Sequence, residues 1–407
     1  MKNGISRVAI EHLERYGGDE IEMGLRNLFD NLGGLQSLIP PHTRRVLVKP
    51  NIVFANSWET GQTTNLVLLE KLVGMIRALG LNVVVGEGPG MPDALEKIGL
   101  TEICRRLGVP LYDFKKGEPV TVAIPDGTAI KSIIVDKALL KCDFHISLAK
   151  MKTHTEVTAS LSLKNMKGLL LTDKERLKFH LQDVHTCLAD IVRVFRPHLA
   201  IVEGLIGLQG MGPGKPGHPI DLGLLVGGTD PLAVDAVCVA KIMRHDPRKI
   251  KYLRLAWEHG CGNIDMEKIE ILGADPDQVA PDKYEMPPTS VEGMSPDKKI
   301  EIAAGGPCSN CIAVLAACLN CYLDRKKIEA GTHSVRILLG ARAQMKATGN
   351  EIAVGNCLKR YKGKIPFIPG CPPPGDTVLP DVIARGLQGN FSADISDLTE
   401  RFDSKLF

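Results

Sequence analysis

The sequence has 407 residues and a formal net charge of +3 at pH 7; 44% of its residues are hydrophobic and 24% are charged. This length accommodates two or three domains with a large buried core. The small net charge argues against nucleic-acid binding, which needs a clustered basic surface. Charges interrupt the N-terminal stretch, and no apolar run reaches the roughly 20 residues that span a bilayer, so we expect a cytoplasmic protein that does not bind membranes.

Short apolar runs alternate with helical patterns over the first two-thirds of the chain. The expected strands are Arg45–Lys49, Asn82–Gly86, Val109–Phe114, Phe144–Leu148, Leu199–Val202 and Leu222–Val226, and the expected helices are Asn65–Leu79, Ala94–Leu107 and Pro231–Met243. Fully apolar strands that alternate with amphipathic helices predict an α/β fold, in which a mostly parallel sheet carries helices on both faces. Ligands of such sheets bind beyond the carboxyl ends of the strands.

The composition divides the chain into four parts. Residues 1–273 form the expected α/β core domain, and residues 274–299, which are rich in Pro, Asp and Ser, form a linker. A smaller cysteine-containing domain is expected over residues 300–387, followed by a polar tail over residues 388–407.

The eleven cysteines are unevenly distributed. Five lie in apolar contexts and are expected to be small buried side chains: Cys104, Cys142, Cys187, Cys238 and Cys261. The other six combine two CxxC pairs with two cysteines beside glycine or proline: Cys308, Cys311, Cys318, Cys321, Cys357 and Cys371. Clustered cysteines in a reducing compartment indicate metal or redox chemistry.

The spacing of these six cysteines favours one subset as ligands. Residues 312–327 contain no glycine or proline and are expected to be helical. A continuous helix would separate Cys308 from Cys318 by about 15 Å, which is too far for one metal ion. We therefore expect a first ligand set of Cys308, Cys311, Cys357 and Cys371. Cys318 and Cys321 remain a second site, redox thiols or core residues.

Four thiolates suit either an iron–sulfur cluster or zinc. The Gly305-Gly306-Pro307 lead-in places Cys308 at a turn that opens a helix, where free backbone N–H groups favour thiolates and an anionic cluster. We expect an iron–sulfur cluster of the 4Fe-4S type. Structural zinc, a disulfide and simple packing remain the alternatives.

Polar residues follow two of the expected strands. Lys49 and Asn51 come at the end of one strand, and Thr64 opens the next helix, so these residues are candidates for an anion site; the alternative is that Thr63 or Thr64 simply caps the helix.

A second polar cluster follows the strand that starts at Phe144. We expect Lys152, His154 and Lys164 to be catalytic. Lys150 and Asn165 are expected to bind a carboxylate or phosphate. The alternative is a solvated basic face.

The glycine-rich segment Gly207–Gly217 lacks both the phosphate-loop and the dinucleotide-binding spacing, and it is interpreted as a mobile loop or lid. Asp230 most simply caps the helix that begins at Pro231. The functional alternative is that Asp230 and Asp235 point into one cleft together with Glu203.

Four segments carry a family resemblance: VLVKPNIV, AKMKTHTEVTASLSLKNMKG, VEGLIGLQGMGPG and GGTDPLAVDAV. Over Arg45 to Gly273 they resemble the domain-of-unknown-function 362 family. The resemblance implies an iron–sulfur protein, since many members carry a ferredoxin-type insert or tail. The compact CxxCxxCxxxCP run of ferredoxins is absent from this chain, and its Gly-Cys-Pro-Pro turn is similar to cluster-binding turns of some respiratory and hydrogenase subunits.

Three functions are consistent with these patterns. The first is an iron–sulfur redox protein, an oxidoreductase if it turns over a substrate, that acts with a small anionic ligand and an electron-transfer protein. The second is a non-redox enzyme (an isomerase, lyase or ligase) with a structural zinc or cluster site. The third is a non-catalytic metal-handling or scaffold protein. Assembly into a homo-oligomer is left open.

Overall fold

The computed structural model describes residues 4–376 and 378–399, which form two compact units. The first unit comprises the chain up to Thr153 together with Ala159–Glu175 and His185–Met286. The second comprises His154–Thr158, Arg176–Val184 and the chain from Pro287 onward. The chain thus passes between the units several times.

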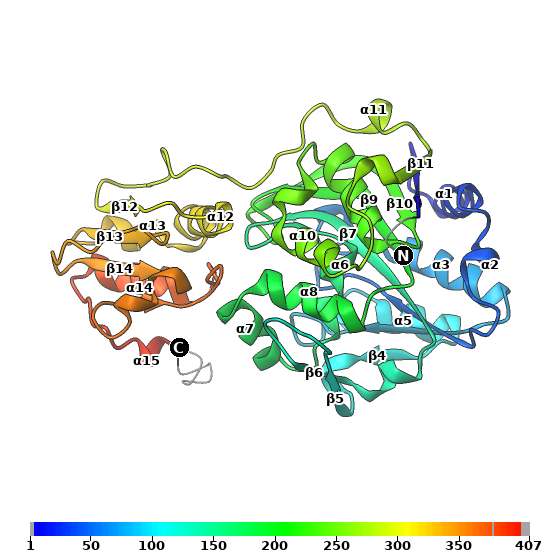
Figure 1. The fold of residues 1–407 in the computed structure, drawn as a ribbon, viewed down its shortest axis with the longest axis horizontal. Helices are drawn as coiled ribbons and strands as arrows, with labels where there is room; N and C mark the ends of the chain where they lie inside the picture. Colours follow the sequence, from blue (N-terminus) through cyan, green and yellow to red (C-terminus); the bar gives the residue numbers. More distant parts are fainter. Residues whose placement is uncertain (1–3, 377, 400–407) are drawn as a thin grey trace. The chain divides into compact units, whose positions relative to one another are not determined.

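A nine-stranded sheet forms the centre of the described part of the first unit (Figure 1). Its strand order is β11-β1-β10-β9-β7-β2-β3-β4, and β8 pairs with β7 off this path. The strands are β1 (Ser6–His12), β2 (Arg45–Lys49), β3 (Asn82–Glu87), β4 (Leu111–Asp113), β7 (Phe144–His154), β8 (Thr158–Ser160), β9 (Leu199–Gly210), β10 (Gly217–Gly228) and β11 (Ile269–Gly273). The run from β9 to β4 is parallel, whereas β10 is antiparallel to both its neighbours. The predicted α/β fold with a mostly parallel sheet is confirmed.

Helices α1 (Gly18–Asn31), α3 (Leu66–Ala78) and α5 (Leu100–Leu107) pack their apolar sides into one core with the parallel strands. Leu69 and Leu72 of α3 are completely buried in this core beside Val48 of β2. Each fully buried leucine stabilises the fold by roughly 1.5–3 kcal/mol. This packing therefore fixes the positions of the strand ends that carry the polar residues.

Further helices and one strand pair complete the first unit. They are α2 (Leu35–Leu38), α4 (Ala94–Lys97), the antiparallel pair β5 (Pro119–Ala123) and β6 (Ser132–Asp136), α6 (Ser162–Asn165), α7 (Asp173–Leu181), α8 (Val184–Val194), α9 (Pro231–Val237), α10 (Lys251–Glu258) and α11 (Pro276–Val279). Parts of α7 and α8 belong to the second unit, which includes Arg176–Val184. Across the described residues, no helix has the length and apolar character required to cross a bilayer.

Several expected elements appear with altered ends. The expected helix Ala94–Leu107 is divided into α4 and α5 at Gly99, whose φ of +84° is left-handed. The loop expected over Gly207–Gly217 is shorter in the structure: residues 211–216 connect the strands, whereas Gly207–Gly210 belong to β9 and Gly217 begins β10, with Gly210 and Gly217 paired.

Four parallel strands form the sheet of the second unit, and they lie side by side in chain order (Figure 1). They are β12 (Ile300–Ala304), β13 (Val335–Leu339), β14 (Glu351–Val354) and β15 (Phe367–Ile368); the helices are α12 (Ser309–Ala317), α13 (Arg325–Glu329), α14 (Val378–Leu387) and α15 (Ser396–Thr399). Parallel strands in sequential order bring all four carboxyl ends to one edge of the sheet.

The helix expected over residues 312–327 is interrupted. Helix α12 passes into a π-helical turn, Cys318–Tyr322, and Leu323 is extended before α13 begins. The expectation of one continuous helix is therefore wrong, because the backbone changes direction after Tyr322.

Candidate metal centre and buried lysine network

The cysteines of the second unit follow the carboxyl ends of three strands. Cys308 comes shortly after β12, Cys357 after β14 and Cys371 after β15. Cys311 lies in the first turn of α12, close to Cys308. The parallel order of the sheet therefore brings thiols that are distant in the sequence to one edge.

The four thiols of the expected first ligand set interact with one another. The Cys311 thiol donates a hydrogen bond to the Cys308 sulfur. The charges of Cys371 and Cys357 also act on the Cys311 thiol. The charge of Cys308 in turn acts on the Cys357 thiol. The structure thus gathers all four predicted ligands into one neighbourhood.

Gly355 lies between these thiols. Its φ is +99°, and a Cβ atom on it would stand 3.7 Å from the Cys357 Sγ and 4.0 Å from the Cys311 Sγ. A side chain at this position would therefore enter the space that the sulfurs border, at a backbone conformation that favours glycine.

Asn356 holds two of the cysteine loops together. Its backbone N–H donates to the Gly370 oxygen at 2.9 Å, and its Oδ1 accepts from the Gly370 N–H at 2.8 Å. Its Nδ2 donates to the carbonyl oxygens of Leu181 and Gln182. These bonds tie the loop after β14 to the loop after β15, which carry Cys357 and Cys371.

Backbone N–H groups point at two of the sulfurs. Hydrogen bonds from the Cys311 thiol and from the N–H groups of Cys311 and Asn310 lower the pKa of the Cys308 thiol to about 6. The Gly340 N–H, at the end of β13, donates to Cys357. Such bonds stabilise thiolates and tune the potentials of sulfur-ligated metals.

The second CxxC pair lies in a different environment. Cys318 is fully buried in the π-helical turn, where burial strongly raises the pKa of its thiol. Cys321 is exposed. Cys318 therefore has the character of a core residue.

No group of three or more His, Cys, Asp or Glu side chains is arranged to hold a single metal ion within residues 4–376 and 378–399. The four thiols of the first ligand set are neighbours around a shared space and do not form a closed shell about one point.

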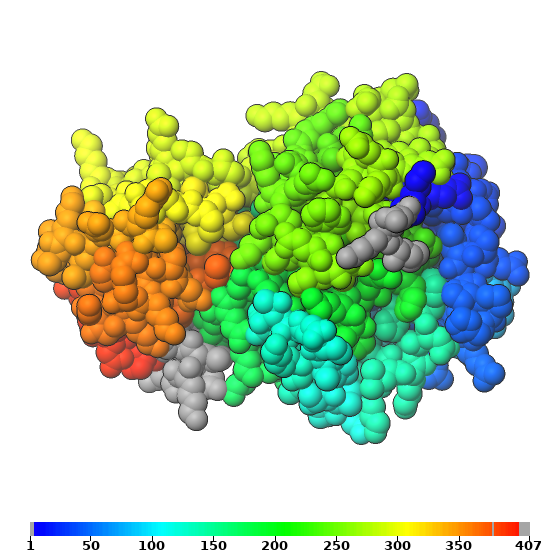
Figure 2. All heavy atoms as spheres, viewed as in Figure 1, coloured from blue at the N-terminus to red at the C-terminus, as the bar shows by residue number. Residues whose placement is uncertain are grey.

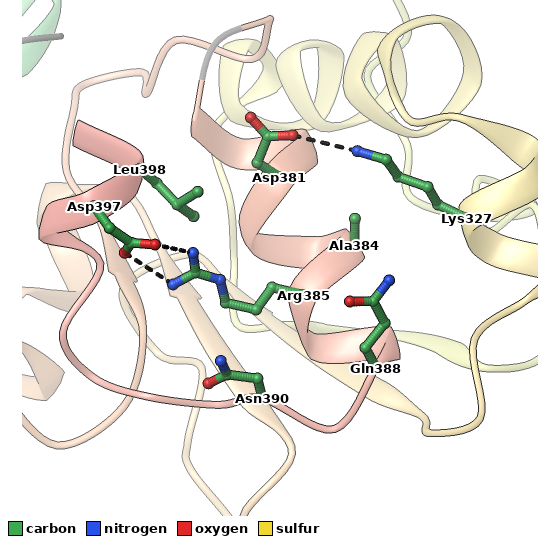
Figure 3. A pocket seen from close by; sticks show the side chains of 8 residues that line it. All are labelled: Lys327, Asp381, Ala384, Arg385, Gln388, Asn390, Asp397 and Leu398. Atoms are coloured by element: carbon green, nitrogen blue, oxygen red, sulfur yellow. Dashed lines mark hydrogen bonds and ion pairs between the residues drawn. The ribbon is translucent and has the colours of Figure 1, made fainter. Parts of the chain in front are cut away.

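A pocket of about 490 Å³ lies elsewhere in the second unit (Figure 3). Its cations already have carboxylate partners: Arg385 contacts Asp397 through two nitrogens, and Lys327 lies 3.6 Å from Asp381. This pairing makes the pocket a weaker candidate for an anion site than the lysines of the first unit.

In the first unit, Lys49 lies at the end of β2 in a completely buried ion pair. Its Nζ donates to both carboxylate oxygens of Glu87, at 2.8 and 2.9 Å, and to the Asn165 Oδ1 at 3.1 Å. Asn51 donates to the same Asn165 oxygen at 3.0 Å. Lys49, Asn51 and Asn165 thus form one hydrogen-bonded group.

Lys150 of β7 forms a second buried pair, with Glu203 of β9. Its Nζ lies 2.8 Å from both carboxylate oxygens, and both side chains are fully buried. Burial lowers the pKa of Lys150, which the nearby carboxylate opposes. The backbone N–H groups of Asn65 and Leu205 also donate to Glu203.

Lys152, two residues further along β7, differs from these lysines. Its Nζ donates to the Asn51 Oδ1 at 2.6 Å and to the Gln62 carbonyl oxygen at 2.9 Å. In the part of the chain that the structure describes, no carboxylate pairs with it. Burial, followed by the charges of Lys164 and Lys150, lowers its pKa well below the usual lysine value.

The two acceptors match the donor capacity of a neutral amine. An ammonium group carries three N–H donors, whereas a neutral amine carries two and keeps a lone pair. With its two hydrogen bonds, neutral Lys152 has both donors satisfied and a lone pair available for a proton. The two acceptors are thus compatible with a neutral amine at Lys152.

Thr64 supports this group from the helix side. Its hydroxyl accepts from the Asn51 N–H at 2.9 Å and donates to the Leu148 oxygen at 3.2 Å. The helix cap is Asn65, whose Oδ1 accepts from Val67 and Leu68. The expectation that Thr63 or Thr64 caps α3 is therefore wrong, because the chain enters the helix one residue later.

His154, the last residue of β7, falls in the second unit, whereas Lys152 falls in the first. The His154 Nδ1 accepts from the Glu156 N–H at 3.2 Å. Lys164 of α6 contributes positive charge to Lys152. The structure therefore associates Lys152 with Lys164.

The carboxylates expected in a shared cleft have separate structural partners. Asp230 caps α9 through the N–H groups of Leu232 and Ala233. Asp235 accepts from the Ser162 N–H and hydroxyl, and burial raises its pKa to about 7. The Asp230 cap is confirmed, and the alternative of a cleft shared with Glu203 is not supported by these contacts.

Sequence reasoning missed Glu87 and Gln62. Glu87 is the last residue of β3 and follows directly on the expected strand Asn82–Gly86, and a lone acid at a strand's carboxyl end is the signal that would have identified it. Gln62 contributes through its backbone carbonyl, which carries no side-chain signal.

Together these features define an α/β protein with two parts. The first has a mostly parallel sheet with buried lysines beyond the strand ends, and the second has a parallel sheet with cysteines at one edge. Residues 46–240 match the model of the family described as Domain of unknown function (DUF362), so this part of the chain is similar to that family.

One curated relative is a protein of Synechocystis sp. named thylakoid-associated protein sll1697. The two proteins are 25% identical over 255 residues, which cover 60% of this chain and 77% of the relative.

Proposed function

We propose that this protein is an iron–sulfur redox protein whose second unit holds a cluster, of the 4Fe-4S type, through Cys308, Cys311, Cys357 and Cys371. The observation that carries the proposal is the convergence of thiols from three strand ends of one parallel sheet. Apolar packing alone does not require four cysteines to share one neighbourhood.

The donor set fits such a cluster. All four groups are thiols, which are the ligands that iron–sulfur clusters take. Gly355 leaves open the space beside the Cys357 and Cys311 sulfurs, and N–H groups point at the Cys308 and Cys357 sulfurs. When bound, the cluster would accept and release single electrons. Zinc also takes four thiolates, so it remains the alternative metal.

The proposal includes a small carboxylate or phosphate as the ligand of the first unit. Lys49 and Lys150 each have a carboxylate partner, but Lys152 has none among the described residues and is further repelled by Lys164. A bound anion would supply the missing negative charge and favour the ammonium form of Lys152. Electron exchange with such a ligand would make the protein an oxidoreductase.

A non-redox enzyme is the second candidate. The observation that favours it is Lys152 itself, because a buried amine of lowered pKa serves as a general base without any redox centre. In that case the metal of the second unit has only a structural role. Cytoplasmic location belongs to the same proposal, since cluster thiols persist in reducing compartments.

The cluster is tested by replacing one cysteine at a time in protein purified without oxygen. Cys357→Ser should abolish most iron binding and the visible charge-transfer absorption of the holoprotein. Cys321→Ser is the matched control, since Cys321 is also exposed but lies outside the ligand set, and it should leave both unchanged. Equal iron content in the two variants would contradict the proposed ligands.

The anion site is tested by calorimetric titration with inorganic phosphate and with small carboxylates. Wild-type protein should bind one of these classes, and Lys152→Met should weaken that binding at least tenfold. Lys137→Met removes an exposed lysine and should bind as the wild type does. Unchanged affinity in the Lys152 variant would count against the lysine network as the binding site.

A further inference from the structure

A pocket of about 290 Å³ lies at the start of α3 in the first unit. It is lined by the loop that follows β2, by the first residues of α3, and by Lys97 and Ile98 after β3. Figure 2 shows blue and light-blue spheres, the colours of this part of the chain, along one side of the first unit. Neither Lys152 nor its partner Asn51 is among the described residues that line the pocket, so it is distinct from the lysine network.

Part of the pocket wall is apolar. Trp58, Leu66 and Ile98 line it, and all three also pack against the core of the first unit. The Trp58 ring lies edge-on to Tyr16, with 5.9 Å between the ring centroids, and the Lys150 Nζ lies 5.7 Å from its centroid. These contacts hold the indole in one orientation, so the wall offers a fixed apolar surface to a ligand.

Asn65 supplies an oriented polar group at the same pocket. The side chain is 1% exposed and lines the pocket. Its Oδ1 accepts from the Val67 and Leu68 N–H groups at 2.8 and 3.1 Å, which fixes the direction of the amide. In the part of the chain that the structure describes, no acceptor takes up the N–H donors of its Nδ2. Because buried donors in native proteins nearly always have an acceptor, the missing one is expected from the pocket.

The charges around the pocket favour an anion. No acid is present among the described residues that line it, and α3 has no acidic residue in its first turn. Lys97 is exposed at the end of α4, and no carboxylate of the described chain forms an ion pair with it. Glu203 accepts from the Asn65 N–H, but it is paired with Lys150. The positive end of the α3 dipole and Lys97 therefore act together on a ligand.

We propose that this pocket binds a small organic carboxylate that carries an apolar group, of the aryl or branched-chain type. The carboxylate would accept from the Asn65 Nδ2 and lie near Lys97, and the apolar group would pack on Trp58 and Ile98. The volume is at the lower end for ligand pockets, which restricts the ligand to a small molecule. The inference goes beyond the proposed function, because it requires neither the cluster nor Lys152.

The test uses Trp58 as the reporter in the full chain. The sequence contains two tryptophans, so Trp257→Phe leaves Trp58 as the single indole. Phenylacetate is the probe, and it should change the Trp58 emission in a saturable way. Phenylacetamide, which lacks the charge, and acetate, which lacks the ring, should each bind about tenfold more weakly or worse.

Two variants of this single-tryptophan protein test the polar groups. Asn65→Ser retains an oxygen that caps α3 but loses the amide donors, and it should weaken phenylacetate binding about tenfold. Lys97→Met removes an exposed charge and should weaken the binding roughly threefold. Lys137→Met, which removes an exposed lysine that does not line the pocket, is the control and should bind as the parent protein does.

Absence of a saturable change, equal affinity for phenylacetate and phenylacetamide, or parental affinity in both variants would overturn the carboxylate site. Binding that Lys152→Met abolishes and Lys97→Met leaves unchanged would place the ligand in the lysine network, and it would also overturn the pocket. Absence of iron from the protein would contradict the proposed function alone.

Discussion

Burial gives Lys152 properties that an exposed lysine lacks. It is 2% exposed, its hydrogen-bond partners are a side-chain amide and a backbone carbonyl, and the charges with the largest effect on its pKa are those of Lys164 and Lys150. Desolvation and like charge both disfavour the ammonium form. Lys49 and Lys150 differ in that each has a carboxylate partner, Glu87 and Glu203, whose charge opposes this penalty.

The lowered pKa of Lys152 predicts a pH-dependent stability. Between the folded and unfolded pKa values the unfolded chain binds more protons, so this residue's contribution makes the free energy of unfolding rise with pH until about pH 10.4, the usual lysine pKa. Lys152→Met removes that contribution. Urea unfolding from pH 7 to pH 10 should show the wild type gaining stability relative to the variant. Parallel pH profiles would mean that Lys152 titrates as an ordinary lysine.

Gly355 provides a second prediction at the residue scale. Gly355→Ala should lower the iron content, because the added methyl group would enter the space beside two sulfurs. Gly349→Ala is the control: its φ of +77° carries comparable strain, about 1 kcal/mol, but no atom lies within 4 Å of its Cβ position. Iron per folded chain is the measurement, and equal loading of the two variants would argue against the role of Gly355.

At the scale of elements, the carboxyl ends of parallel strands gather the polar residues. The sequence predicted β2 to the residue and β3 to within one residue at its end, because apolar runs bounded by turn residues are a strong signal. It did not predict β14 or β15, since a strand of four residues that begins with Glu351 and a strand of two residues carry no clear periodicity. The neighbourhood of Cys357 and Cys371 therefore had to be inferred from cysteine spacing alone.

The buried pair between β7 and β9 should contribute strongly to stability. Lys150→Met leaves the fully buried Glu203 carboxylate without its ammonium partner, which should cost about 3–5 kcal/mol in the free energy of unfolding. Lys137→Met breaks an exposed pair with Glu118 and should have no measurable effect. Denaturant titration of both variants checks this difference. A small effect equal to that of Lys137→Met would show that the Lys150–Glu203 pair contributes little to stability.

At the scale of the whole molecule, the units do not follow the linear order of the chain. The second unit includes His154–Thr158 and Arg176–Val184 as well as the C-terminal part. Within it, Asn310 of the first CxxC turn donates to the Thr155 oxygen and the Thr158 hydroxyl, both at 3.1 Å. Composition indicates linkers but carries no signal for segments exchanged between units, so these contacts and the placement of His154 were beyond sequence reasoning.

Metal removal should affect the two units differently. Loops tied by thiolate–metal bonds lose that restraint when a chelator removes the metal, so hydrogen exchange should accelerate around β14 and β15. The strands β2 and β9 belong to the other unit and should keep their protection. Exchange measured by mass spectrometry on untreated and chelated protein tests this. Uniform acceleration across both units would show that the metal stabilises more than its own unit.

The most direct test is the iron and acid-labile sulfide content of the full chain, purified without oxygen. The account predicts about four iron and four sulfide per chain. Colourless protein that contains neither, or that contains zinc in their place, would contradict it.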